Sequence, residues 1–291
     1  MKVIDSYLDG GKEIRWKSLG SRRIKDRVAF ALSYVVLGIM VIVLLSIFIY
    51  VLDSGASHIA LKMLITTGNT ATGGVLNAIV GTWELVGMGL LFSLPPSILG
   101  ALYVVNSRSN GTVSMVARLF TDILTSVPSI VIGFFAFIVL VQRLNMGYSL
   151  VAGGLALAIM MLPYLMRIIE ISFRNIPKEQ IENAYALGAD DIRVASRIYL
   201  PQAKVGMLSG TLLAVSIAAG ETAQLLYSAG WNNGFASGFL HSGVGYLTYV
   251  VWNGINYPTT YSHYLAYVSA MILILSVTGL IAVSKYIGRR K

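Results

Sequence analysis

The chain has 291 residues, of which 56% are hydrophobic and 12% charged, about half the charged share of an ordinary soluble domain. It has no cysteine, which excludes disulfides, thiolate metal sites and cysteine nucleophiles. Its three histidines, His58, His241 and His263, are not spaced as a metal site. Mean hydropathy is +0.72, and apolar runs long enough to cross a bilayer recur, so the sequence predicts an all-α, polytopic membrane protein.

Six apolar runs predict six transmembrane helices. In chain order they cover residues 28–52, 76–105, 116–141, 149–171, 204–229 and 263–284, and they contain Pro95, Pro96, Pro128 and Pro163. Proline kinks a membrane helix, and neighbouring helices then satisfy the freed carbonyls. The first run and the basic leader before it are too long for a cleaved signal peptide, so we expect an uncleaved helix.

Basic residues give the direction of these helices. The leader 1–27, the loops after the second and fourth helices and the C-terminal tail hold 20 of the 22 Lys and Arg residues, whereas the alternate loops hold only Lys62 and Arg143. The positive-inside rule therefore predicts that both termini are cytoplasmic, in a plasma or inner membrane. This topology also explains the net charge of +9, so we expect no nucleic-acid partner.

A polar stretch, ENAYALGADDIRVASRIYLP, lies in the predicted cytoplasmic loop between the fourth and fifth helices. Residues 178–187 suit a short helix, with Pro177 at its first turn and Gly188 ending it in the left-handed conformation. A second helix, about 190–199, can start behind Asp190 or Asp191 as its cap. From periodicity alone, a surface helix joining two spans is sufficient explanation.

The spacing within this stretch resembles the EAA loop of ABC-importer membrane subunits, E-A-A-x3-G-x9-I-x-L-P. The positions in register are Glu182, Ala184, Gly188, Ile198, Leu200 and Pro201, while Asn183 replaces the second alanine. In that family the loop docks on the ATPase and couples it to transport, which implies a coupling loop at 177–201. The chain has no G-x4-G-K-[ST] motif, so we expect no cofactor in this chain, no enzymatic activity, and ATP-Mg in a separate ATPase.

Residues 73–285 resemble the PstA-type permease family of phosphate ABC importers. The resemblance rests on VPSIVIGFFAF (127–137), LALAIMMLPYLMR (155–167) and GETAQLLYSAG (220–230). It implies a type I ABC importer permease fold between the first helix (28–52) and a basic tail (286–291). The implied partners are a PstB-like ATPase, a distinct PstC-like permease forming a heterodimer, and a PstS-like extracytoplasmic phosphate-binding protein.

Two positions depart from the family pattern. Ile217 stands where the family often has arginine, and Gln224 stands where it has proline. An anion path would lose a positive group at Ile217, for which Arg167, the partner chain or helix N-termini would have to compensate. A permease for sulfate, molybdate or tungstate therefore stays open as an alternative.

Charged and hydroxyl groups inside the spans are pathway candidates. Glu221, between Gly220 and Thr222, lies about 25 Å into the fifth span at 1.5 Å per residue. An ionised carboxylate there costs at least about 2.5–3.5 kcal/mol, so it must face protein or water, either as a pathway group or as a tie between helices. Ser126 and Ser129 flank Pro128 and could offer hydroxyls to an oxyanion from a broken helix, with kink packing as the alternative.

Three further acidic residues lie in or near the predicted spans, and one long outer loop carries no charge. Glu84 lies inside the second span, so like Glu221 it is either a pathway group or a structural one. Asp122 and Glu170 are expected on a partly solvated surface near the cytoplasmic side. The uncharged loop 230–262 contains LTYVVWNGI, which suits a short helix.

The expected function is alternating access driven by the partner ATPase. An ATP-independent secondary transporter or channel, and a membrane anchor or sensor without transport, are the rival interpretations. The transporter or channel leaves the EAA spacing unexplained, and an anchor or sensor would tolerate loss of Glu221 and of the small residues in the spans.

Overall fold

The structure is a computed structural model that describes residues 18–68, 73–106 and 112–289. The chain forms two units, residues 1–51 and 52–291. The first unit holds most of helix α2 (Ser18–His58), which continues into the second. Its side chains from Val28 to Tyr50 are largely exposed and apolar, as lipid contact requires. The first predicted span is confirmed as a helix, although α2 is longer at both ends. Residues 1–17 of the predicted basic leader, and 290–291 of the tail, lie outside the described residues.

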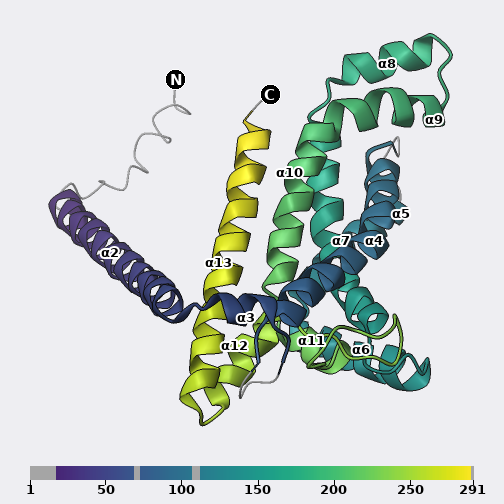
Figure 1. The fold of residues 1–291 in the computed structure, drawn as a ribbon. Coiled ribbons are helices and arrows are strands. Elements are labelled where there is room, and N and C mark those ends of the chain that lie inside the picture. Colours follow the sequence, from purple (N-terminus) through teal and green to yellow (C-terminus); the bar gives the residue numbers. More distant parts are fainter. Residues whose placement is uncertain (1–17, 69–72, 107–111, 290–291) are drawn as a thin grey trace. The chain divides into compact units, whose positions relative to one another are not determined.

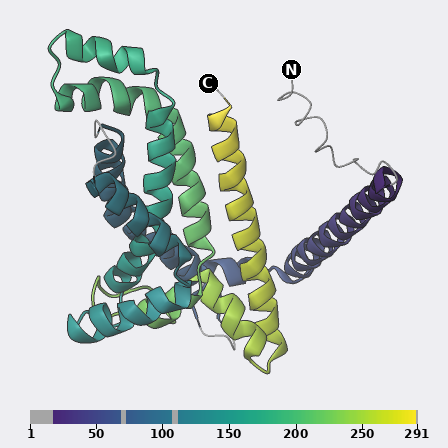
Figure 2. The same ribbon diagram turned by 180° about the vertical axis from the view of Figure 1, so that it is seen from behind.

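Every regular element among the described residues is helical. The second unit contains α3 (Leu61–Ile65), α4 (Leu76–Asn106), α5 (Thr112–Ser126), α6 (Ser129–Ala136), η1 (Phe137–Arg143), α7 (Leu150–Arg174), α8 (Lys178–Ala186), α9 (Asp191–Val194), η2 (Ala195–Tyr199), α10 (Leu200–Ala219), α11 (Ala223–Ser228), α12 (Leu247–Asn256) and α13 (Thr260–Gly288). Helices α7, α10 and α13 run side by side; α8 and α9 lie at one end of them, and α6, α11 and α12 at the other (Figures 1 and 2).

Five helices of the described chain are long and apolar enough to cross a membrane, and they include the predicted second, fourth and sixth spans. The third predicted span is not one kinked helix. It breaks at Pro128 into α5 and α6–η1, which are bent by 99°. Pro128 has extended backbone angles (φ −57°, ψ 137°) and no N–H to donate to the helix before it, so the helix ends there and restarts in a new direction.

The fifth predicted span has different limits. The helical segment α9–η2–α10 is continuous from Asp191 to Ala219, then breaks before α11. The predicted limits, 204–229, are therefore wrong at both ends. A proline ring clashes with the carbonyl four residues earlier in a regular helix. For Pro201 that residue is Arg197, which lies in the π-helical turn η2, where the backbone turn is wider and accommodates the ring.

The core of the second unit lies between α4 and α7. Small residues let these helices approach closely: a Cβ added to Gly89 would lie 2.9 Å from Leu157 Cβ, and one added to Gly154 would lie 2.4 Å from Met88 Cγ. Around this contact the buried core includes Leu85, Met161, Leu165, Ile169 and Phe173. A smaller cluster under α3, α12 and α13 holds Met63, Val75, Leu247, Leu265 and Val268.

Candidate functional site

The polar loop forms the predicted short helix, α8, in which every residue is at least partly exposed. Its end is built as expected. The Gly188 N–H donates to the Tyr185 carbonyl (2.9 Å) and the Ala189 N–H to the Ala184 carbonyl (3.0 Å), the paired bonds of a Schellman cap. Gly188 has φ +82°, a conformation that side chains disfavour. The predicted left-handed stop at Gly188 is confirmed.

One face of α8 attaches to the body of the protein. Ile181, Ala184 and Tyr185 pack partly buried against the core. The Gln202 Nε2 of α10 donates to Gln180 Oε1 at 2.6 Å. At the start of α9, Asp190 Oδ1 accepts from the Arg193 N–H at 2.8 Å, which confirms the predicted cap.

The other face of the loop is free of packing in the described chain. Glu182 and Asn183 are exposed, as are the apolar Leu187 at 89% and Ile192 at 78%. Exposed apolar side chains of this size on a projecting element are typical of a protein-binding surface. Of the remaining residues that match the EAA spacing, Ile198 and Leu200 pack partly buried against the core and Pro201 is exposed.

At the far end of α7 and α10, the two broken helices meet (Figure 1). Helices α6 and α11 lie so close that a Cβ added to Gly133 would be 2.5 Å from Gln224 Cα. The Ser129 side chain lies near the Glu221 carboxylate, on the other side of the contact between α6 and α11. Glu221 thus lies in the break between α10 and α11, not inside a helix as expected, because the helix ends at Gly220.

The predicted pathway residues around these breaks form one partly open group. Ser126, Pro128 and Gly220 are exposed, and Ser129, Glu221 and Thr222 are half-buried. The group therefore combines one carboxylate, three hydroxyls and backbone that is not in a helix. Such backbone is tolerated at membrane depth where it faces protein or a water-filled space.

Helix α12, which is distant in sequence from these residues, supports the break between α10 and α11. The Thr248 Oγ1 of α12 donates to the Glu221 carbonyl at 2.7 Å, and Thr82 Oγ1 of α4 accepts from the Leu247 N–H at 2.9 Å. The stretch LTYVVWNGI does form the expected helix, α12. Its role as a support for the break depends on a contact between residues distant in sequence.

Gln224, which stands where the resembled family has proline, is fully buried beside the break. Its Nε2 lies 3.5 Å from the Met160 sulfur, and its Oε1 has no hydrogen-bond partner among the described residues. A buried, unpaired amide oxygen is a cost to the fold in this conformation.

Glu170 of α7 is buried at 3% exposure, so its expected position on a partly solvated surface is wrong. Three arginines cover it: Arg174 Nε at 2.8 Å, Arg118 Nη2 at 3.3 Å and Arg167 Nη1 at 3.6 Å. Arg167 therefore belongs to this cluster and not to the group around Glu221. The spacing 167, 170, 174 places three of these residues on one helix face, a signal that could have predicted the cluster. Asp122 is exposed, as expected.

The described chain contains no group of three His, Asp or Glu side chains that could hold a metal ion. Its hydroxyls, arginines and carboxylates suit hydrogen bonding to a polar solute and contact with other proteins.

Comparison with known proteins gives the family. The profile of the binding-protein-dependent transport system inner membrane component family matches residues 93–290. The chain belongs to this family. This permease is 33% identical to the phosphate transport system permease protein PstA 2 of Mycobacterium bovis, with 92% of this chain and 89% of the relative covered. It is 30% identical to the PstA of Yersinia pestis, with 96% and 95% covered.

Solved structures of ABC importers share the permease's fold. A bacterial ABC transporter involved in the import of alginate matches with a TM-score of 0.57 at 13% identity, covering 94% of this chain and 98% of that one. The MetNI methionine ABC transporter matches with a TM-score of 0.53 at 19% identity, covering 74% and 94%. The permease therefore has the type I importer fold, with its apolar helices in a membrane.

One side of α4 in this permease is exposed along the span. Glu84, Gly87, Leu91 and Pro95 recur at three- and four-residue spacing and are all exposed. A carboxylate on a lipid-facing surface is costly, and a neighbouring glycine permits close helix approach. This side of α4 therefore has the character of a helix-packing surface.

Proposed function

We propose that the chain is the PstA-type permease subunit of a phosphate importer driven by a separate ABC ATPase. The observation that carries the proposal is α8: an exposed helix with a left-handed stop at Gly188, an apolar tip, and a continuous helical path from α9 to the break at Glu221. The names of its relatives in Mycobacterium bovis and Yersinia pestis support phosphate as the solute.

The proposed orientation places α8, and both termini, in the cytoplasm. The basic loops support this direction. The exposed residues Leu187 and Ile192 then contact the ATPase. The complex also contains a second, PstC-like permease, and an extracytoplasmic phosphate-binding protein delivers the solute to it. ATP and Mg²⁺ bind to the ATPase, and this chain holds no cofactor.

The proposed mechanism is alternating access. When the ATPase subunits close, they move α8, and the stiff segment 191–219 carries that movement to the break at Gly220. There the contact between Glu221 and Ser129 shifts, and with it the angle between the broken helices. Glu221 acts beside the path, since an unpaired carboxylate repels an anion; the Ser126, Ser129 and Thr222 hydroxyls are suited to contact it.

The test is uptake of labelled phosphate, at low external phosphate, by cells that lack the chain and by cells in which it is restored. Restoration should recover high-affinity uptake. A Gly188→Trp copy should fail, because tryptophan cannot adopt φ +82° without strain and its bulk would occupy the docking surface. Gly188→Asn is the matched control: asparagine tolerates the left-handed region, and a Cβ there meets open space, so uptake should persist.

A permease for another oxyanion is the second candidate. It is favoured by Ile217, which is 38% exposed on α10 where the resembled family often has arginine. Restored sulfate, molybdate or tungstate uptake, with phosphate uptake unchanged, would establish that candidate and contradict the phosphate assignment.

A further inference from the structure

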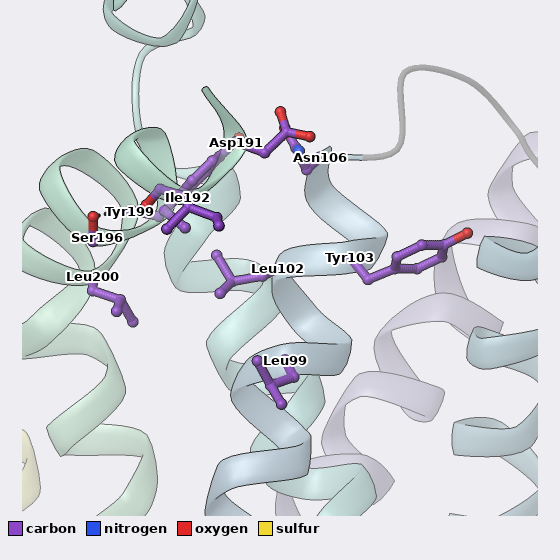
Figure 3. Close-up of a pocket in the computed structure, with 10 residues that line it drawn as sticks. Leu99, Leu102, Tyr103, Asn106, Asp191, Ile192, Ser196, Tyr199 and Leu200 are labelled. Carbon is purple, nitrogen blue, oxygen red and sulfur yellow. Dashed lines mark hydrogen bonds between the residues drawn. The ribbon is translucent and has the colours of Figure 1, made fainter. Parts of the chain in front are cut away.

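The region between the end of α4 and the coupling helix is loosely packed. A cavity of about 580 Å³ lies between α4 and α9–η2–α10, lined by Leu99, Leu102, Ile192, Ser196 and Leu200 among others (Figure 3). A second cavity of about 400 Å³ lies between α4 and α8, lined by Val105, Lys178, Ile181 and Glu182. Asn106 and Tyr199 belong to both linings. The end of α4 is thus separated from the coupling loop by space on two sides.

One side chain bridges this space. The Tyr185 hydroxyl of α8 lies 2.7 Å from Asn106 Oδ1, on the last residue of α4, and 2.9 Å from Asp191 Oδ1, on the first residue of α9. It can donate its proton to either oxygen. Figure 3 shows Asn106 and Asp191 beside each other, and both line the larger cavity. Three elements therefore meet at a single phenol group.

The bridge suits a contact that forms and breaks. Burial raises the pKa of Tyr185, and its hydrogen bond to Asp191 raises it further, so the hydroxyl stays protonated and neutral at physiological pH. Breaking its contact with Asn106 therefore separates two neutral groups. The cavities on either side mean that few packed apolar contacts would be lost when α8 moves away from α4.

We propose that Tyr185 is a positioning residue that latches the coupling helix α8 to the end of α4, and that this latch opens and closes during each transport cycle. Tyr185 lies outside the positions that match the EAA spacing. The inference rests on the proposed function, and it adds α4 to the elements that respond to the ATPase. Because α4 packs along α7, release of the latch would free the pair to move relative to α8.

Tyr185→Phe tests the latch because it keeps the ring and removes only the hydroxyl. The permease, its partner permease, ATPase and binding protein would be assembled in vesicles, and phosphate uptake and ATP hydrolysis measured together. We expect the ratio of phosphate moved to ATP hydrolysed to fall about fivefold, the shift expected from one net hydrogen bond, while ATP hydrolysis without binding protein rises. A structural defect would lower uptake and hydrolysis together.

Matched variants sharpen this test. Tyr103→Phe removes a hydroxyl from the wall of the same cavity, from a side chain that is 51% exposed, and should leave the ratio unchanged. Asn106→Leu should lower the ratio as well, and adding it to Tyr185→Phe should change little, because Tyr185→Phe has already removed the contact with Asn106. Additive effects would overturn the pairing.

A cross-link tests whether the latch opens. The chain has no cysteine, so Asn106→Cys with Tyr185→Cys would introduce its only two thiols, which a short, reductively cleavable bifunctional reagent can join. Cross-linking should lower uptake below that of the untreated double variant, and reduction should return uptake to that variant's own level. The reagent should not change the uptake of either single-cysteine variant. Full uptake by the cross-linked protein would overturn the proposal. Wild-type vesicles without phosphate uptake would contradict the proposed function instead.

Discussion

Glu170 shows how a single buried charge organises its surroundings. The carboxylate is almost fully buried, whereas the three arginines around it are half-exposed. The arginines can therefore regain water when the pairing is lost, but the carboxylate cannot. Removing one arginine should lower the free energy of unfolding most when that arginine makes the shortest contact with the buried carboxylate.

The cluster predicts unequal effects of two similar changes. Arg174→Gln removes the hydrogen bond at 2.8 Å and should lower the free energy of unfolding by about 1.5–3 kcal/mol. Arg167→Gln removes a 3.6 Å contact from a side chain that is 62% exposed, and should cost under about 1 kcal/mol. Thermal unfolding in detergent measures both, and equal losses would contradict this assignment of roles.

For single residues, helix stops and caps could be predicted from the sequence, whereas side-chain partners on other helices could not. The stop at Gly188 and the cap at Asp190 depend on neighbouring residues, so spacing alone predicts them. The arginines around Glu170 come partly from α5, and Tyr185 finds its partner on α4. No periodicity within one segment reports a contact between two segments, so it could not reveal Arg118 or the partner of Tyr185. The spacing of Arg167 and Arg174 from Glu170, by contrast, could have predicted the rest of the cluster.

Among the elements, the broken helices depend on close packing. A methyl group at Gly133 would approach the backbone of Gln224 to 2.5 Å, and backbone cannot swing away as a flexible side chain can. Gly133→Ala should therefore destabilise the fold by about 1–3 kcal/mol. Gly279→Ala is the control, since a Cβ there meets open space and alanine favours helix by about 1 kcal/mol. Thermal unfolding of the two variants should shift in opposite directions.

The hydrogen bond from Thr248 of α12 to the break between α10 and α11 can also be tested. Thr248→Val keeps the shape of the side chain but leaves the Glu221 carbonyl without its 2.7 Å donor. We expect a loss of about 1–3 kcal/mol in stability and reduced uptake. Thr248→Ser restores a hydroxyl and should recover most of both. A serine variant as impaired as the valine variant would show that the methyl group matters, not the hydrogen bond.

The sequence could locate these breaks only in part. Pro128 predicts that the third span bends, but the 99° angle is set by packing of α6 against α11. The break at Gly220 falls inside an apolar run that continues to residue 229, so hydropathy alone predicts one uninterrupted helix. Hydropathy indicates whether a segment prefers the membrane or water, and it does not report whether the helix within that segment is continuous.

For the whole molecule, the exposed side of α4 predicts where the second permease packs. Glu84 lies on that side, and as a charged group within a membrane span it should face protein. Glu84→Cys would give the chain a single thiol. Its labelling by a maleimide should fall when the partner permease is co-expressed, since the packed core of an interface excludes the reagent. Unchanged labelling would place the interface elsewhere.

As a whole, the transporter would move phosphate through this chain with energy from a separate ATPase. The most direct test of this is the complete transporter in sealed vesicles, with ATP inside and loaded binding protein outside, measuring accumulated labelled phosphate. Accumulation should require ATP and disappear in the Gly188→Trp variant, while Gly188→Asn retains it. Accumulation that persists without ATP, or in the Gly188→Trp variant, would contradict the account.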